Sequence, residues 1–171
     1  MHTERLANLL GATALAVSDK MIREVTARTK TSPSASAALV VLLEGGPKGV
    51  TELGGCLGLT QSAATRTLDS LESAGLVRRT RAGRTSAVAL TATGRRRAAT
   101  VLRARTDWLA DLTATLDEAD RAHLDRILGT LLTRVYDEIP AADLLCRLCD
   151  RRACTHESVC PVGQAERDRS G

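Results

Sequence analysis

The sequence predicts a mainly α-helical protein that carries one small β-hairpin. Apolar residues recur at helical spacing along most of the chain, whereas one short stretch alternates in the manner of paired strands. Aromatic residues make up 1% of the 171 residues, and Phe is absent. The core must therefore be built from Leu, Val, Ile and Ala, which suit packed helices better than a β-sandwich. With 43% hydrophobic and 26% charged residues, the chain can bury such a core.

The first predicted elements are two helices of unequal length. Residues 5–30 carry apolar side chains with a period near 3.6, which indicates one long amphipathic helix that ends before Pro33. Ser34 is placed to cap a shorter helix over 35–43. The Glu-Gly-Gly-Pro sequence at 44–47 then stops this helix.

Two short helices joined by a glycine-containing turn follow. Thr51 is the predicted N-cap of a helix over 52–57, which Gly58 ends. Thr60 caps the next helix, over 61–74. Two helices with this spacing are typical of a helix-turn-helix unit.

A β-hairpin and two more long helices complete the predicted fold. Residues 76–80 and 86–90 indicate two strands, and the turn between them has arginine at both ends. A helix then starts near 91–93 and runs to about residue 116. Asp117 caps a last helix, which ends at Pro140.

Basic charge is concentrated in one region of the sequence. The whole chain has a formal net charge of +4. Residues 66–105 hold ten arginines and only two acids, so this window carries +8 and the rest of the chain carries −4. A solubilising surface is the alternative interpretation. The coincidence of charge, turn spacing and hairpin instead favours a nucleic-acid binder.

Duplex DNA suits these elements better than RNA, because RNA-binding sheets usually stack bases on aromatic side chains and this segment has none. The second helix of the pair presents amide, hydroxyl and guanidinium groups, which read base edges in the major groove. The hairpin arginines, above all Arg84, are placed to reach phosphates or the adjacent minor groove. The candidate DNA-binding residues are Thr60, Gln61, Ser62, Thr65, Arg66, Arg78, Arg79, Arg81 and Arg84.

Four sequence runs in this region carry a family resemblance: Thr51–Leu53, Leu57–Gln61, Leu68–Arg79 and Leu90–Arg95. They resemble the MarR family of bacterial transcriptional regulators, and the order of elements matches over about residues 5–140. The resemblance implies a winged helix-turn-helix homodimer with a recognition helix at 60–74, a wing at 78–88 and a palindromic operator. It also implies repression that a small ligand or an oxidant relieves.

Dimerisation has independent support in the two long amphipathic helices toward the chain ends, because they carry more apolar surface than a small winged helix can cover. A dimer would place two recognition helices about one DNA turn apart, which matches a palindrome. We therefore divide the chain into an N-terminal dimerisation helix (1–33), a winged helix-turn-helix domain (34–92), C-terminal dimerisation helices (93–140) and a Cys-rich metal-binding tail (141–171).

Four of the five cysteines fall within residues 146–160, in the spacing C-x2-C-x4-C-x5-C. Thiolates this close can converge on one site, with the C-x2-C pair as a chelating turn. An iron–sulfur sensor, a structural zinc and reduced or disulfide-bonded thiols remain open. One C-x2-C pair and Pro161 after the last cysteine are more typical of iron–sulfur ligation. His156 could replace one cysteine as a ligand, but a surface histidine is the favoured interpretation. The candidate metal ligands are Cys146, Cys149, Cys154 and Cys160, and Cys56 is expected to be a small buried apolar residue.

The sequence therefore predicts a DNA-binding transcriptional regulator, a repressor, whose operator affinity responds to a metal or redox change at the four cysteines. The alternative is a regulator released by a small organic ligand, with the cysteines holding structural zinc. We expect no enzyme activity, because the three histidines are scattered and form no nucleophile-and-base pattern. No apolar run approaches the roughly 20 residues that span a bilayer and no signal peptide is recognised, so we expect a cytoplasmic location.

Overall fold

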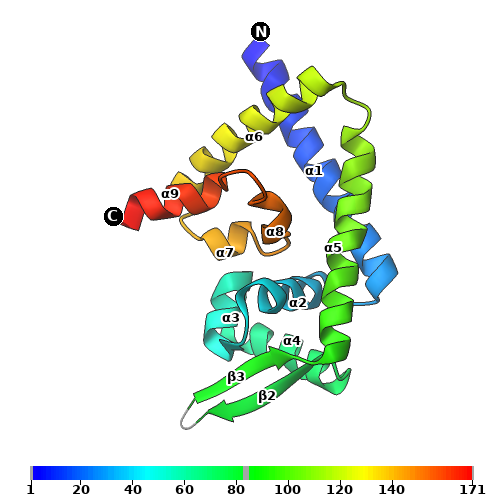
Figure 1. The fold of residues 1–171 in the computed structure, drawn as a ribbon, viewed down its shortest axis with the longest axis vertical. Helices are drawn as coiled ribbons and strands as arrows, with labels where there is room; N and C mark the ends of the chain where they lie inside the picture. The colour runs from blue at the N-terminus through cyan, green and yellow to red at the C-terminus, as the bar shows by residue number, and fades with distance from the viewer. Residues whose placement is uncertain (1, 83–84, 171) are drawn as a thin grey trace.

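The computed structural model describes residues 2–82 and 85–170 (Figure 1). This part of the chain is mostly helical, with short strands in one antiparallel sheet, which confirms the predicted fold class. The helices are α1 (His2–Thr29), α2 (Pro33–Gly45), α3 (Val50–Leu57), α4 (Gln61–Ser73), α5 (Ala92–Thr113), α6 (Glu118–Glu138), α7 (Ala142–Leu145), α8 (Arg151–Cys154) and α9 (Pro161–Ser170). The strands are β1 (Lys48–Gly49), β2 (Val77–Ala82) and β3 (Thr85–Leu90).

Polar side chains cap the start of several helices, at Thr60 and Asp117 as the sequence predicted and also at Thr91, within the range predicted for that helix start. Thr60, Thr91 and Asp117 each accept a hydrogen bond from the backbone N–H three residues on, at 3.3, 3.0 and 2.8 Å. These side chains begin α4, α5 and α6, because each satisfies one of the backbone donors that a helix leaves unpaired at its first turn.

Two predicted caps are wrong. Ser32, not Ser34, caps α2, and its hydroxyl oxygen accepts from the N–H three residues on at 3.2 Å. Gly49, not Thr51, is the N-cap of α3, and its N–H donates to the Glu52 carboxylate at 3.3 Å. Glu52 therefore supports a cap that is made by the backbone of Gly49. The Thr51 hydroxyl is not needed for capping and is available for another contact.

Helix α2 lies at the centre of the core. Its residues 35–42 are all buried, and it contacts α1, α3, α4, α5 and β3. The inward face predicted for α4 is confirmed, because Ala64, Leu68 and Leu71 are at most 2% exposed. The opposite face of α4 is therefore free to point outward, since helical residues three or four apart share one side.

The sheet has the order β1-β3-β2, and β2 and β3 form the predicted hairpin. Their register runs from Val77 opposite Leu90 to Ala82 opposite Thr85, so both strands extend further toward the turn than predicted. Strand β1 was not predicted, because two residues carry no periodic signal. Pairing with β3, with Lys48 opposite Val88, defines it.

The start of α5 lies tightly against the segment that enters the wing. The Thr91 N–H donates to the Leu76 carbonyl oxygen at 3.1 Å, and the Thr91 hydroxyl donates to the Gly75 carbonyl oxygen at 2.8 Å. A Cβ atom on Gly94 would lie 1.9 Å from that same Leu76 oxygen. Glycine is therefore required here by the close approach of two backbones.

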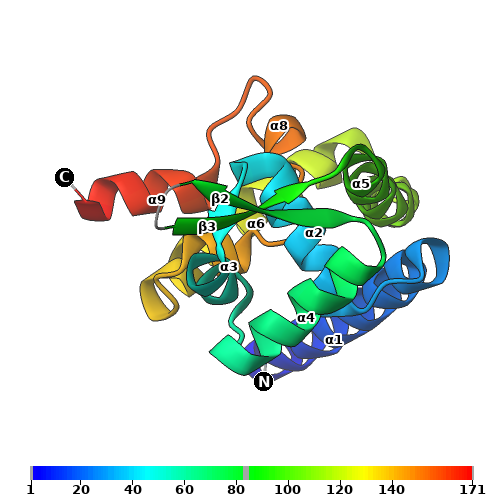
Figure 2. The ribbon, with the colours of Figure 1, turned by 90° about the horizontal axis from the view of Figure 1, so that it is seen from below.

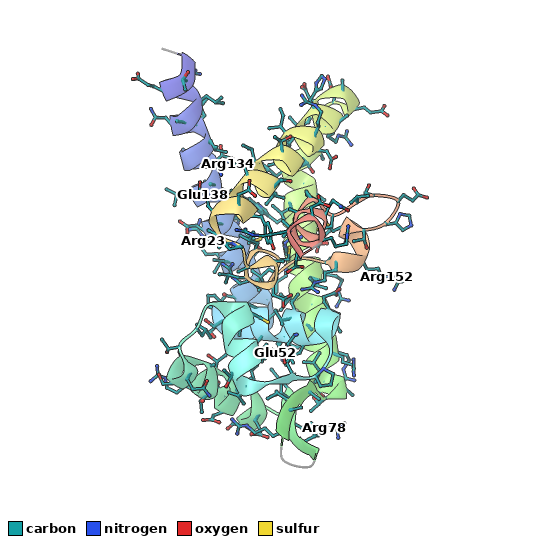
Figure 3. The ribbon with its side chains drawn as sticks, turned by 90° about the vertical axis from the view of Figure 1, so that its left-hand side faces the viewer. Arg23, Glu52, Arg78, Arg134, Glu138 and Arg152 are labelled. Atoms are coloured by element: carbon teal, nitrogen blue, oxygen red, sulfur yellow. The ribbon has the colours of Figure 1, made fainter. Side chains whose placement is uncertain are left out.

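Helices α1, α5 and α6 extend away from the winged helix (Figure 1). Helix α1 packs along α5, and an ion pair of 2.6 Å joins Arg28 to Asp107. The free ends of α1 and α6 diverge as two arms, as Figure 3 shows. No helix in the part of the chain that the structure describes has the length and hydropathy that a bilayer crossing requires.

The cysteine-bearing tail folds into α7, α8 and α9, short helices that the sequence pattern did not resolve. Helix α9 contacts α6 and α7, and α7 contacts α3 (Figures 1 and 2). Asp150 caps α8 by accepting from the N–H three residues on at 2.9 Å, and Val162 of α9 is 2% exposed. The tail is therefore packed between the arm helix α6 and the winged helix.

Candidate nucleic-acid interface and cysteine cavity

Helix α4 presents its polar face to solvent at the end of the molecule seen in Figure 2. Thr60, Gln61, Ser62 and Arg66 are exposed, and Thr65 is half-buried. These side chains occupy the first two turns of α4, opposite the buried apolar face. The structure therefore brings this group of predicted DNA-binding residues together on one surface.

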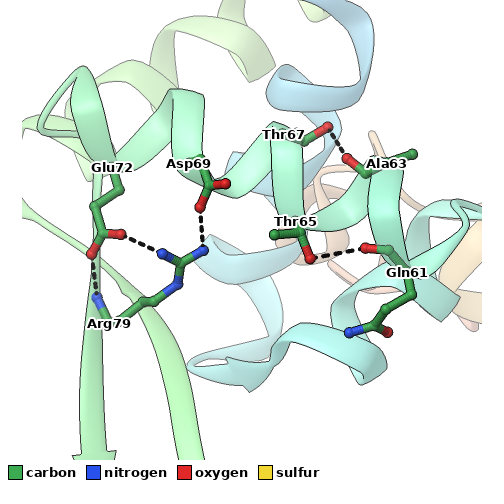
Figure 4. Close-up of polar contacts among 7 residues, drawn as sticks. All are labelled: Gln61, Ala63, Thr65, Thr67, Asp69, Glu72 and Arg79. Carbon is green, nitrogen blue, oxygen red and sulfur yellow. Dashed lines mark hydrogen bonds and ion pairs between the residues drawn. The ribbon is translucent and has the colours of Figure 1, made fainter.

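Internal hydrogen bonds orient part of this surface. The Thr51 hydroxyl of α3 donates to the Gln61 side-chain oxygen at 3.1 Å. The Thr65 hydroxyl donates to the Gln61 backbone carbonyl at 2.9 Å (Figure 4). Since Thr51 holds the amide oxygen, it directs the Gln61 amide group. Sequence reasoning missed this role of Thr51, because it requires the packing of α3 on α4.

Arg79 of β2 is bound to the acids of α4 (Figure 4). Its guanidinium contacts the Asp69 carboxylate at 2.6 Å and the Glu72 carboxylate at 2.8 Å. Its backbone N–H also donates to Glu72 at 3.1 Å. The hydrogen bond to Asp69 raises the pKa of Arg79, and both carboxylates add to this effect. Arg79 thus ties the wing to α4, a positioning role beside its predicted DNA contact.

The other wing arginines are described in part. Arg78 is exposed, and Figure 3 places it at the wing end of the molecule, away from the arms. The backbone of Arg81 pairs with Ser86 in the hairpin. Arg84 and the side chain of Arg81 lie outside the residues that the structure describes. Their predicted DNA contacts stay predictions.

The four tail cysteines line one cavity of about 190 Å³. Cys146 is the C-cap of α7, Cys154 ends α8, and Cys160 precedes α9, so the short helices gather residues that are up to fourteen positions apart. All five cysteines carry free thiols. Among the described residues, no three His, Cys, Asp or Glu side chains are already arranged around one metal-ion position. The four predicted ligands therefore line one cavity, but among the described residues their side chains do not surround a single metal-ion position.

Two of the cysteines that line this cavity, Cys146 and Cys149, differ in pKa. A side-chain hydrogen bond between Cys146 and Cys149 raises the pKa of Cys146 and lowers that of Cys149 to about 6. Arg105 and Arg151 also lower the pKa of Cys149, against the effect of burial. The Gly163 N–H donates to the Cys160 sulfur at 3.4 Å. Cys149 is therefore the thiol most readily ionised at neutral pH.

Asp143 joins this cavity to α3. One of its carboxylate oxygens accepts from the Arg151 guanidinium, and the other accepts from the Cys56 thiol at 3.3 Å. Burial acts to raise the pKa of Asp143, but these two hydrogen bonds hold it below its usual value. Burial, followed by the contact with Asp143, raises the pKa of Cys56 to about 11. Cys56 is buried as predicted, and it is also a neutral donor to the tail.

A second cavity of about 200 Å³ lies where α1, α2 and α3 meet the tail. Its wall combines apolar side chains with serine residues and one arginine. The residues that line it are Ile22, Val25, Pro33, Ser34, Ser36, Ala37, Leu57, Arg147 and Leu148. This cavity is large enough for a small organic molecule, although it lies below the usual range for drug-sized ligands.

Comparisons with known proteins agree with the geometry of the winged helix. A model of the MarR family matches residues 23–86, which include the helix pair and most of the wing. A MarR family protein from Bacillus stearothermophilus is 27% identical, with a TM-score of 0.71 over 78% of this chain and 95% of that chain. No curated protein matches the sequence.

Two further solved structures share the fold at lower identity. The YusO protein from Bacillus subtilis is 23% identical, with a TM-score of 0.66 over 75% of this chain and 93% of that chain. MepR, a transcription regulator of the Staphylococcus aureus multidrug efflux pump MepA, is 15% identical, with a TM-score of 0.67 over 75% and 97% of the two chains. These matches confirm the resemblance that the sequence motifs carry. Residues 23–86 thus match the MarR family model, and the chain shares its fold with solved structures of MarR family proteins.

Proposed function

We propose that this MarR-type regulator binds a palindromic operator in duplex DNA as a homodimer and represses transcription there. The observation that carries the proposal is the exposed polar face of α4 beside an arginine-bearing wing. Helix α4 enters the major groove, where the Gln61 amide and the Arg66 guanidinium read base edges. Arg78, Arg81 and Arg84 contact phosphates or the adjacent minor groove, and Arg79 positions the wing against α4.

The exposed apolar side chains of the arms support a second copy of this chain as the dimer partner. They line α1 and α6 and are between 36% and 70% exposed, which is unusual for large apolar residues that remain in water. A two-fold dimer buries the same surface on each copy and presents two recognition helices to a palindrome. These residues are Leu6, Leu9, Leu10, Leu15, Ile127, Leu128, Leu131, Leu132, Val135 and Ile139.

Selection of bound sequences from a random pool of DNA duplexes tests this function. We expect the selected sequence to be an inverted repeat that binds one dimer, with a steep fall in affinity as salt rises. Sedimentation of the free protein and of the complex gives the number of chains. A selected site without two-fold symmetry, or an affinity that salt leaves unchanged, would contradict the proposal.

Arg66→Ala is expected to relax sequence preference at one base pair in each half-site. Discrimination at that base pair should fall by about 1–3 kcal/mol, because a bidentate arginine contact to a base edge is lost. Competition titrations with operators substituted at single positions measure this change. Arg169→Ala, an exposed arginine of α9, is the matched control and should keep full discrimination. Unchanged specificity in Arg66→Ala would remove this residue from the base-reading face.

Arg79→Ala is expected to weaken operator binding up to about tenfold while leaving the salt dependence close to wild type. The reason is that the guanidinium is held by Asp69 and Glu72, whose carboxylates would face DNA unpaired after the substitution. Fluorescence anisotropy over a series of salt concentrations measures both quantities. Arg78→Ala is the comparison, and it should lower the salt slope by about one phosphate contact. A loss of slope in Arg79→Ala would instead identify Arg79 as a phosphate contact.

We further propose that Cys146, Cys149, Cys154 and Cys160 hold an iron–sulfur cluster and that its state sets DNA affinity. All four donors are thiols around one cavity of about 190 Å³. The single C-x2-C pair and the proline that follows the last cysteine support a cluster rather than a single zinc ion. The guanidinium groups that line the cavity offset the negative charge of four thiolates. When bound, the cluster would supply one-electron redox chemistry.

The second cavity favours one alternative, in which a small organic ligand releases the DNA and the cysteines hold structural zinc. Anaerobic purification followed by visible absorption spectroscopy and by iron, sulfide and zinc analysis separates the two. A coloured protein with iron and sulfide is the expected result. A colourless protein with one zinc per chain would establish the alternative metal.

A further inference from the structure

Helix α7 lies between the cysteine cavity and the first helix of the DNA-binding pair. It contacts α3 on one side and α9 on the other (Figure 1). Cys146 is the C-cap of α7, and its N–H donates to the Ala142 carbonyl oxygen at 2.9 Å. The first proposed ligand is therefore joined to a helix that touches α3, and a displacement of that ligand displaces α7.

The polar link between the two regions is Asp143 of α7. Asp143 and Arg151 both line the cysteine cavity, and the arginine binds one carboxylate oxygen. The other oxygen accepts from the thiol of Cys56, a residue of α3 that is 7% exposed. A single carboxylate thus contacts both the cavity wall and a buried side chain of the helix pair.

Apolar contacts also join the cysteine-bearing tail to α3 and to the hydrophobic clusters. A Cβ placed on Gly58, the C-cap of α3, would lie 3.1 Å from a terminal carbon of Leu144. Leu148 stands between the cysteines of the C-x2-C turn and packs against both hydrophobic clusters of the protein. The turn that would bind metal is therefore held against the cores on either side of it.

Helix α3 connects the Cys56–Asp143 hydrogen bond to the polar face of α4. Cys56 and Thr51 belong to the same helix of eight residues, and Thr51 holds the side-chain oxygen of Gln61 at 3.1 Å. A helix this short moves as one unit, because its backbone hydrogen bonds connect successive turns. A shift at Cys56 thus changes the position of the residue that directs Gln61.

We propose that Asp143 and Cys56 are positioning residues that transmit the state of the cysteine site to α3, and through Thr51 to the recognition helix. This inference rests on the proposed function of the cysteine site. The Cys56–Asp143 hydrogen bond couples the cysteine site to the DNA-binding surface if it differs between the metal-loaded and metal-free protein. The coupling is then measured as the ratio of the operator affinities of these two forms.

The test compares operator affinity of the full chain as purified anaerobically and after treatment with a metal chelator. In the wild type the two affinities should differ by roughly 5–150-fold. Cys56→Ala removes the donor to Asp143 and should bring the ratio to within about twofold of one, with metal content unchanged. Cys56→Ser keeps a hydroxyl donor in the same place and should retain the wild-type ratio.

A second variant acts from the tail side of the contact. Asp143→Asn keeps the shape of the side chain but replaces one of the two accepting oxygens with an NH2 donor, so the contact to either Arg151 or Cys56 is lost. In this variant too, the ratio of the two operator affinities should fall to within about twofold of one, while the metal content stays at the wild-type level. Asp137→Asn, an exposed acid of α6, is the control and should behave as wild type.

The outcomes separate the coupling from the function on which it rests. A wild-type ratio of one would overturn the proposed function of the cysteine site, and the coupling with it. A clear wild-type ratio that Cys56→Ala or Asp143→Asn preserves would overturn the coupling alone. A purely structural role for these residues would shift both affinities equally and leave the ratio intact, which would also overturn it.

Discussion

Gly94→Ala is expected to destabilise the winged helix by on the order of 3 kcal/mol or more. The new Cβ atom would lie 1.9 Å from the carbonyl oxygen of Leu76, and the Leu90 side chain is also near at 3.2 Å. The clash is with backbone, so no side-chain rotation relieves it. Either α5 or the entry to the wing must move, which breaks the hydrogen bonds that Thr91 makes to this segment.

Urea denaturation followed by circular dichroism measures this loss. A domain of this size is typically stable by about 5–15 kcal/mol, so the midpoint should fall well outside experimental error. Gly55→Ala is the matched control, because a Cβ there meets nothing within 4 Å. That substitution should be neutral or stabilise α3 by up to about 1 kcal/mol. Equal midpoints for the wild type and Gly94→Ala would contradict the close approach described for α5.

Cys149→Ser is expected to lower metal affinity roughly 100-fold or more, which would leave the purified protein nearly free of iron. Cys149 belongs to the chelating C-x2-C pair, and its pKa is lowered to about 6 by the hydrogen bond from Cys146 and by nearby arginines. A serine hydroxyl does not ionise in this range and offers a harder donor than sulfur. The thiolate that is most available for metal would therefore be lost.

Iron and sulfide per chain, together with visible absorption, measure the effect in anaerobically purified protein. Cys56→Ser is the matched control, because it makes the same chemical change at a cysteine that does not line the cavity. It should retain the wild-type metal content. Full metal content in Cys149→Ser would exclude the four-cysteine site altogether.

Much of the winged helix could be predicted because its signals are local. The period of 3.6 placed Leu68 and Leu71 on the buried face of α4, and the caps Thr60 and Asp117 marked two helix starts. The error at Ser34 arose where two serines flank Pro33. Proline is favoured at the first helical position, so that rule correctly identifies Ser32 as the cap.

The features that escaped prediction depend on contacts between distant parts of the chain. The ion pairs of Arg79 join a strand to residues seven and ten positions earlier, and they exist only after the wing folds beside α4. Asp143 lies 87 residues from Cys56, and neither local sequence indicates the other. The cysteine spacing did predict a shared location, but not that α7 would connect it to α3.

The position of Leu148 has a consequence for the order in which this protein acquires its final packing. Leu148 contacts both hydrophobic clusters, yet it belongs to a segment that is synthesised well after the helix pair and the wing. During translation the helix pair and the wing therefore emerge before the residue that packs against both clusters. Because Cys146 and Cys149 lie on either side of Leu148, the segment that adds this packing also carries the first two of the four candidate metal ligands.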